Sequence, residues 1–416
     1  MSKRISIDPR DLLDRIRAFG DVGRAADGRL SRVAGTEADR AGRDTLVAWM
    51  RDHGLAIDID AIGNVFGTWG RERNDVHTPV VMIGSHVDTV ADGGIYDGAY
   101  GVLAGLAAMR ALIASGARPR RPVTLAAFTN EEGVAYTPDM MGSLVHAGGL
   151  GLAEALGSRG PEGSTLGEAL ERIGYAGPLA PSTIQPESYV ELHVEQGPVL
   201  DSEGTVIGVV EGVQGISWQR LTIEGEANHA GTTPMHLRRD ASLAAARIVT
   251  FVHDLASASN GSTVGTVGSL ALEPGVVNAI PGRAVLTVDL RAVDAAQLSS
   301  AEESVAAFVG TLRRETGVRI DAERLVRLDA VAFDPAICAQ VEAAAQRRGL
   351  SSRRMTSGAG HDAQMIARIA PAAMIFVPST AGISHSPREH TPDDALVAGA
   401  NVLLDVVAEL AGIGTG

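Results

Sequence analysis

The sequence is poor in cysteine, in aromatic residues and in long apolar runs. Cys338 is the single cysteine among 416 residues, which excludes an internal disulfide and suits a reducing cytoplasm. Aromatic residues make up 4% of the chain, too few to favour stacking platforms for nucleic-acid bases. The first residues are charged, and no apolar run reaches the length of about 20 residues that a membrane-spanning helix needs. We therefore expect a soluble, cytoplasmic protein.

Positive charge is also scarce. The chain has 36 lysines and arginines against 50 acidic residues, a net charge of -14, which argues against nucleic acid and anionic membranes as partners. Its length exceeds one ordinary domain and predicts two. Apolar residues amount to 45% of the chain, enough for a sizeable core. Composition does not indicate which reaction or ligand the protein serves, and one stretch of the sequence does.

The stretch 84–98, GSHVDTVADGGIYDG, predicts a functional loop. It follows an apolar, β-branched run at 79–83 that is typical of a buried strand, and a helical pattern begins where it ends. Within it His86, Asp88 and Asp97 are residues of the kind that bind metals. Loops at the carboxyl ends of such strands carry the chemistry of α/β proteins. Alone, the stretch could also be a polar loop with one histidine, so the prediction depends on ligands from elsewhere.

Three other predicted strands end in residues that can bind metals: Glu131 with Glu132, His193, and His385. Imidazoles suit zinc, and carboxylates offset the charge of two dications held about 3.5–4 Å apart. Asp97 is the best bridge between two ions, because its short side chain lies between the segments that carry the others. Asp88 is well placed to accept the second N–H of the His86 imidazole.

The adjacent glutamates Glu131 and Glu132 point in different directions at a strand end, so only one of them need be a ligand. The other can stand beside an activated water as general base. A lone Glu-Glu pair would more often be a solvated turn, but four converging strand ends favour the functional interpretation.

The character of the sequence changes between about Gly212 and Leu328. Outside this segment, strand and helix patterns alternate, which predicts a mixed or parallel sheet with helices on both faces. Inside it, cleanly alternating strands such as 283–291 and two helical patterns predict a small α+β domain. We therefore expect an α/β domain formed by 1–212 and 329–416, with 213–328 inserted into it.

Nine motifs occur in order along nearly the whole chain: GSHVDTV, YDGAYGV, TNEEG, ELHVEQGPVL, ANHAGTTPM, VVNAIPG, VDLR, SGAGHDA and GISHSPREHT. Together they resemble the dinuclear zinc amidohydrolases that include N-carbamoyl-L-amino-acid hydrolase, β-ureidopropionase and allantoate amidohydrolase, relatives of the aminoacylase and dipeptidase exopeptidases. Each motif alone is weak, whereas nine in register are highly specific. The resemblance implies a zinc-exopeptidase-like α/β/α catalytic domain and an inserted α+β domain for lid closure and homodimerisation.

The same resemblance implies two divalent metal ions in each subunit. His86 and His193 would hold one ion together with Asp97, and Glu132 and His385 would hold the other, with Asp97 bridging. Zinc is expected, and manganese, cobalt or nickel are alternatives because borderline metals overlap in their ligand preference.

Glu131 would then be the general base that activates a water between the two ions. The implied reaction is hydrolysis of a linear amide C–N bond, that of an N-carbamoyl-L-amino acid or N-carbamoyl-β-alanine, to amino acid, CO2 and ammonia. Alternatives are an allantoate amidohydrolase, an N-acyl-amino-acid deacylase or dipeptidase, and a metal-binding scaffold without catalysis. The intact Glu131 beside a full ligand set argues against the scaffold.

The resemblance also implies residues that bind the substrate. His229 would polarise the scissile carbonyl in the active site of a second subunit, and Asn278 and Arg291 would receive a substrate carboxylate, with Gln196 and the Gly360 backbone nearby. Without the family, His229 would be an exposed turn histidine and Arg291 half of a surface salt bridge. A guanidinium at the polar end of a strand does suit a planar carboxylate.

The chain departs from the family's pattern at two positions. Ala135 and Leu144 stand where basic residues are common. Both lie near the expected substrate pocket, so they leave the metal chemistry intact and put the natural substrate in doubt.

Overall fold

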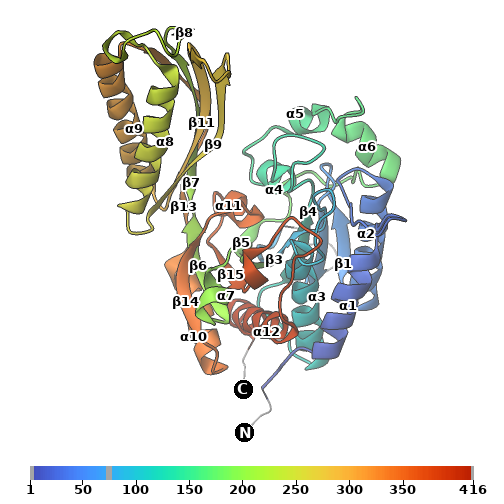
Figure 1. Ribbon diagram of the computed structural model, residues 1–416. Coiled ribbons are helices and arrows are strands. Elements are labelled where there is room, and N and C mark those ends of the chain that lie inside the picture. The colour runs from blue at the N-terminus through green and yellow to red at the C-terminus, as the bar shows by residue number, and fades with distance from the viewer. Residues whose placement is uncertain (1–3, 72–76, 414–416) are drawn as a thin grey trace. The chain divides into compact units, whose positions relative to one another are not determined.

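The computed structural model describes residues 4–71 and 77–413 (Figure 1). Its internal contacts divide the chain into two compact units. Unit 1 consists of 1–212 and 333–416, and unit 2 of 213–332. Within the described ranges, no helix is both long enough and apolar enough to cross a membrane.

Unit 1 is built on a mixed sheet with the strand order β1-β2-β4-β3-β5-β15-β6, and β14 also pairs with β6. The pairs β3–β4, β3–β5 and β5–β15 are parallel, while β1–β2, β2–β4 and β6–β15 are antiparallel. The strands are β1 (Ala56–Ile59), β2 (Val65–Trp69), β3 (Val80–His86), β4 (Val123–Phe128), β5 (Pro186–Val194), β6 (Ile207–Val213), β14 (Ser352–Ser357) and β15 (Ala372–Val377).

Helices cover both faces of this sheet. Every residue of β3, β4 and β15 is buried, and successive strand residues point to opposite faces, so both faces must be covered. The mixed α/β fold class that the sequence predicted is therefore confirmed. The helices are α1 (Pro9–Asp21), α2 (Glu37–Asp52), α3 (Ala99–Ala114), α4 (Met141–His146), α5 (Leu152–Gly157), α6 (Leu166–Ile173), α7 (Val199–Glu203), α10 (Pro335–Arg347), α11 (Asp362–Ile366) and α12 (Asp393–Leu410), with a 3-10 turn η2 (Thr380–Gly382).

Unit 2 is an antiparallel sheet, in the order β12-β7-β11-β9, packed against two long helices. In β11 alternate residues such as Leu286 and Val288 are buried in one core with residues of α8 and α9, and the residues between them are half-exposed. The elements are β7 (Gly215–Glu224), β8 (Asn228–His229), a 3-10 turn η1 (Met235–Leu237), α8 (Ala241–Ser257), β9 (Thr263–Glu273), β10 (Ala279–Ile280), β11 (Arg283–Ala292), α9 (Ala295–Thr316), β12 (Arg319–Leu328) and β13 (Val331–Ala332).

Candidate metal centre

The predicted ligands of unit 1 come from neighbouring strand ends. His86 is the last residue of β3, and His193 is the second-to-last residue of β5. Glu131 and Glu132 follow β4, and His385 follows η2 in the loop after β15. Since β3, β4, β5 and β15 are parallel, their carboxyl ends share one edge of the sheet, and the loops that follow them meet there.

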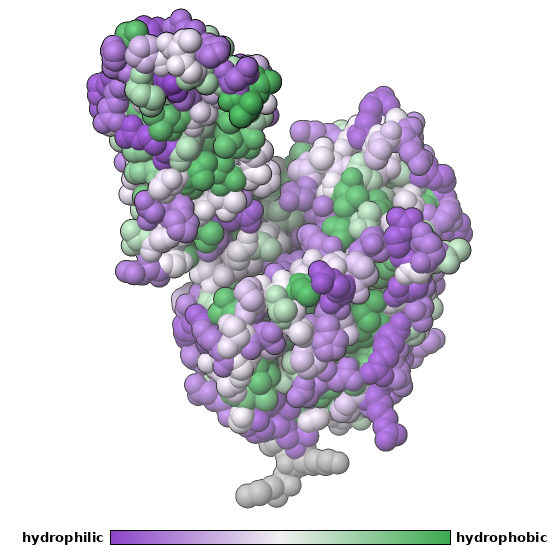
Figure 2. Space-filling view, viewed as in Figure 1, coloured by the Kyte–Doolittle hydropathy of each residue, from purple (hydrophilic) through white to green (hydrophobic). Residues whose placement is uncertain are grey.

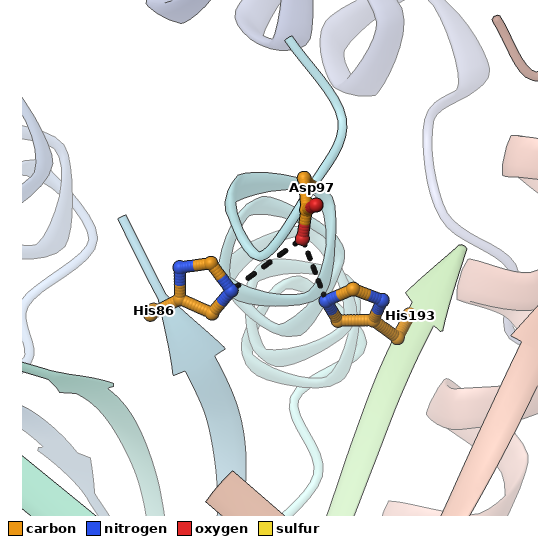
Figure 3. Close-up of side chains that lie close together, drawn as sticks. All are labelled: His86, Asp97 and His193. Carbon is orange, nitrogen blue, oxygen red and sulfur yellow. Dashed lines mark ion pairs between the residues drawn. The ribbon is translucent and has the colours of Figure 1, made fainter. Parts of the chain in front are cut away.

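The first ligand group is His86, Asp97 and His193, all buried (Figure 3). Asp97 Oδ1 lies 3.5 Å from His86 Nε2 and 3.2 Å from His193 Nε2. Asp97 directly precedes Gly98, the residue before α3. A Cβ on Gly98 would lie 2.4 Å from the His86 ring, and the φ of Gly98 is +61°, so glycine is needed here on both counts.

The second group is Asp97, Glu132 and His385. Its histidine Nε2 lies 3.3 Å from Asp97 Oδ2 and 3.5 Å from Glu132 Oε2. The two oxygens of Asp97 therefore face different groups, one each. A bridging carboxylate has this arrangement.

The distances fit divalent ions. Ligands held at about 2.1 Å from a tetrahedral ion lie about 3.4 Å from one another, close to the spacings in both groups. A third group in the described ranges, made of Glu191, His193 and His361, shares a histidine with the first. The donor set of imidazoles and carboxylates suits zinc and its borderline neighbours. The chain therefore has the residues to bind divalent metal.

Main-chain carbonyls fix the orientation of the two buried imidazoles. His193 Nδ1 lies 2.9 Å from the Val194 carbonyl oxygen, and His86 Nδ1 lies 3.0 Å from that of Asp88. Asp88 thus orients the ring through its main chain, and not through its carboxylate, which is 3.9 Å away. The carboxylate has other donors. It accepts from the backbone N–H groups of Glu131 and Glu132, each at 3.3 Å, and so ties the Glu-Glu turn to the first loop.

The turn after β4 directs its two glutamates differently, as expected. Glu131 Oε2 lies 3.5 Å from His86 Nε2, whereas Glu132 contacts His385 and accepts from the Val90 N–H. Burial raises the pKa of Glu131 well above its usual value; the His86 charge lowers it, and nearby carboxylates raise it further. A carboxyl with a raised proton affinity accepts a proton from water more readily than an exposed glutamate does.

Burial and neighbouring charges also shift the pKa values of the second ligand group. Burial and the charge of Asp97 raise the pKa of Glu132 to about 7, and the hydrogen bond to Asp97 raises that of His385 to about 9. Burial would raise the pKa of Asp97, but its hydrogen bonds to His193, His385 and His86 hold it well below the usual range. Asp97 is therefore ionised, and its negative charge is shared among three imidazoles.

A cavity of about 140 Å³ opens onto this cluster. Of the expected substrate-binding residues, Gln196 and Gly360 line it. Gln196 Nε2 donates to Asp97 Oδ2 at 2.8 Å and lies 3.3 Å from His385 Nε2, so this amide contacts two of the three ligands of the second group. The departures Ala135 and Leu144 are half-buried and are not among the lining residues.

Two residues that line the cavity were not predicted from the sequence. His361 is not among the predicted site residues, yet its ring centroid lies 4.6 Å from that of His193 and it lines the cavity. Asp139 was not considered, because nothing in its spacing brings it back to the Glu-Glu turn. A backbone hydrogen bond from Met140 to the Glu131 carbonyl oxygen, 2.7 Å long, does so.

The other expected substrate-binding residues lie in unit 2. His229 in β8 pairs with Ala279 in β10, and the Ala230 N–H donates to the Asn278 carbonyl oxygen at 2.9 Å. His229 and Asn278 are thus neighbours, and both are exposed. Arg291 lies near the far end of β11 and pairs with Asp289 at 2.9 Å, as the plain salt-bridge interpretation anticipated.

Comparison with known proteins identifies the family. The profile of peptidase family M20/M25/M40 matches residues 82–409. An N-carbamoyl-L-amino acid amidohydrolase of Geobacillus stearothermophilus is 38% identical to this chain, over 96% of the chain and 98% of the relative. An allantoate amidohydrolase of Bacillus subtilis is 34% identical, over 96% and 97%.

A solved structure agrees. An amidase of the hydantoinase/carbamoylase family from Burkholderia multivorans is 39% identical, covers 98% of both chains and superposes with a TM-score of 0.94. These similarities confirm the resemblance that the nine motifs indicated. The chain belongs to peptidase family M20/M25/M40, and it is a metal-binding amidohydrolase.

Proposed function

We propose that this enzyme cleaves a carbamoyl group from an amino acid, an N-carbamoyl-L-amino acid or N-carbamoyl-β-alanine, to give the amino acid, CO2 and ammonia. The observation that carries the proposal is the buried carboxylate of Asp97, shared between two ligand groups, with Glu131 beside it. The names of its relatives support the ureido substrate, since one acts on N-carbamoyl-L-amino acids and one on allantoate.

We also propose a cytoplasmic location, which suits the buried Cys338 thiol that forms no disulfide.

The two groups would hold two divalent ions, with zinc as the first choice. His86 and His193 would hold one with Asp97, and Glu132 and His385 would hold the other with Asp97. Such ions polarise a carbonyl oxygen and lower the pKa of water when they are bound. The same ligands accept manganese, cobalt or nickel.

Glu131 moves the proton in this scheme. Its carboxylate takes one proton from the attacking water and delivers it to the leaving nitrogen, as the C–N bond to the carbonyl carbon breaks. The products are the amino acid and carbamate, and carbamate decomposes to CO2 and ammonia. The raised proton affinity of Glu131 makes it suitable for both transfers. Burial of Glu131 and Asp97 strengthens these charge interactions.

A second copy of the chain would complete the site. His229 and Asn278 lie in the β8–β10 ribbon, beside the Arg283 end of β11, whereas Arg291 lies at its other end. From Arg283 to Arg291 the strand rises about 26 Å, much more than the length of an amino-acid derivative. One copy therefore cannot bring all three residues to one substrate. Arg291 from one subunit and His229 with Asn278 from the other can do so.

The surface of unit 2 suits such a homodimer. Strand β9 pairs only with β11 in the part of the chain that the structure describes, so it leaves an open edge. Most exposed large apolar side chains of the described residues belong to this unit, and Figure 2 shows hydrophobic surface there. Exposed apolar patches of this kind mark protein interfaces. The exposed apolar side chains of unit 2 include Trp218, Met235, Val264, Leu270, Leu272 and Val277.

A substrate panel tests the proposed reaction. Carbamoyl, formyl and acetyl amino acids, N-carbamoyl-β-alanine and allantoate are compared by ammonia and amine release. We expect turnover with ammonia release from a carbamoyl compound, and loss of about 10²–10⁴-fold in kcat for Glu131→Gln, because a general base contributes that much. Metal content should be unchanged in the variant, since Glu131 belongs to neither ligand group. Exclusive cleavage of acetyl substrates, or full turnover by Glu131→Gln, would contradict the proposal.

Metal binding should release protons. At pH 7 the metal-free site holds a proton on His385, whose pKa is about 9, and part of one on Glu132, whose pKa is about 7. Zinc must displace them, so its apparent affinity should rise with pH between 6 and 9. The pKa of His385 is higher in the folded chain than in the unfolded chain, so protonation of His385 stabilises the metal-free fold. This contribution is fully present below about pH 6.5 and is lost as pH rises through about 9. Titration calorimetry in two buffers of different ionisation enthalpy measures the release. A pH-independent affinity would argue against the assigned ligands.

Subunit exchange tests the shared site. His229→Ala and Glu131→Gln homodimers should each be nearly inactive, since removal of a carbonyl-polarising donor costs about 10²–10³-fold in rate. When the two variants are mixed and allowed to exchange, the hybrid dimer has one site with both residues intact. We expect activity to return in proportion to the hybrid fraction. No recovery, with hybrid formation verified by mass spectrometry, would show that His229 does not act across the interface.

A further inference from the structure

Glu389 is a buried carboxylate that belongs to neither ligand group. It lies in the loop between η2 and α12, four residues after His385, and is 6% exposed. Its Oε1 accepts hydrogen bonds from the backbone N–H groups of Tyr96 and Asp97, both at 3.1 Å. Its Oε2 accepts from the Ser384 hydroxyl at 3.1 Å. One side chain thus joins the loop that carries Asp97 to the loop that carries His385.

The contact with the first loop fixes the main chain at the bridging residue. Two consecutive N–H groups, of Tyr96 and Asp97, point at the same oxygen, so the backbone there has little freedom to rotate. That backbone sets the direction of the Asp97 Cα–Cβ bond, from which the carboxylate extends toward the histidines. Because Glu389 is buried, these hydrogen bonds are shielded from water, and an electrostatic interaction is stronger there than at the surface.

The contact with Ser384 determines which of two carboxylates accepts the hydrogen of its hydroxyl group. This hydroxyl has one hydrogen and two carboxylate oxygens in reach, Glu389 Oε2 at 3.1 Å and Asp97 Oδ2 at 3.4 Å. When Glu389 accepts the hydrogen, Asp97 Oδ2 keeps a lone pair for the second ligand group, beside the bond that it already accepts from Gln196. Glu389 therefore acts on both the backbone and the charge of the bridging carboxylate.

The sequence of the first loop leaves room for this carboxylate. A Cβ on Gly94 would lie 2.4 Å from Glu389 Oε1 and 2.6 Å from its Cβ, so any side chain there would displace Glu389. The φ of Gly94 is not in the left-handed region, so alanine could adopt its backbone. The glycine is needed for space alone.

We propose that Glu389 is a positioning residue for the metal centre, which holds Asp97 and the His385 loop in the geometry that binds both ions. The inference rests on the proposed function, because it assigns the bridging role to Asp97. Hydrogen-bonding partners of metal ligands typically affect metal affinity by about 10–100-fold.

Zinc affinity measured by competition with a chromophoric chelator tests the proposal. Glu389→Ala should weaken zinc binding about 10–100-fold. Glu389→Gln should weaken it less, because the amide oxygen still accepts from Tyr96 and Asp97 while the NH2 group can no longer accept from Ser384. Gly94→Ala should weaken binding as well, although it removes no hydrogen-bonding group. This last variant keeps the proposal falsifiable if Glu389→Ala does not fold.

Asp334→Ala is the matched control. The Asp334 carboxylate also accepts hydrogen bonds from two consecutive backbone N–H groups, those of Ala336 and Ile337 at 2.9 and 3.0 Å, but it is the N-cap of α10 and belongs to neither ligand group. This variant should lower thermal stability and leave zinc affinity unchanged. If Glu389→Ala and Gly94→Ala behave in the same way, Glu389 is merely structural and the inference is wrong. Failure of the unmodified protein to bind zinc would instead overturn the proposed metal centre itself.

Discussion

The site depends on one interaction, the contact of the Asp97 carboxylate with three imidazoles. Both of its oxygens face histidine nitrogens at 3.2–3.5 Å, and the side chain is almost fully buried. Burial of an unpaired carboxylate would be costly. The histidines stabilise its charge instead and hold its pKa low, whereas burial raises the pKa values of Glu131 and Glu132. Divalent ions placed between these groups would satisfy both imbalances at once.

The fold provides this contact by simple means. Parallel strands carry His86 and His193 to one edge of the sheet, and α3 begins two residues after Asp97. The supporting contacts that do exist are mostly main-chain groups and buried carboxylates. Asp88 ties the first loop to the Glu-Glu turn, and Glu389 ties it to the loop of His385. Neighbouring loops thus hold one another in place.

The sequence predicted the fold class and the grouping of the metal-type residues, because strand patterns and motifs are local. The ends of β3 and β5 could be placed within a residue or two, and parallel order then brings their histidines together. Contacts between distant segments were not predictable in this way. Glu389 meets Asp97 across 292 positions of the chain, with no periodicity to signal it. The carboxylate of Asp88 was assigned to the nearest imidazole, yet it serves two backbone donors more than 40 positions away. The separation of His229 from Arg291 likewise required the strand register of unit 2.

The central claim is that Asp97 bridges two divalent ions, and anomalous diffraction from crystals of the zinc-loaded protein tests it most directly. Data collected on both sides of the zinc absorption edge locate the ions without reference to activity. The account predicts two peaks about 3.5–4 Å apart, one on each side of the Asp97 carboxylate. A single peak, or two peaks that Asp97 does not join, would contradict it.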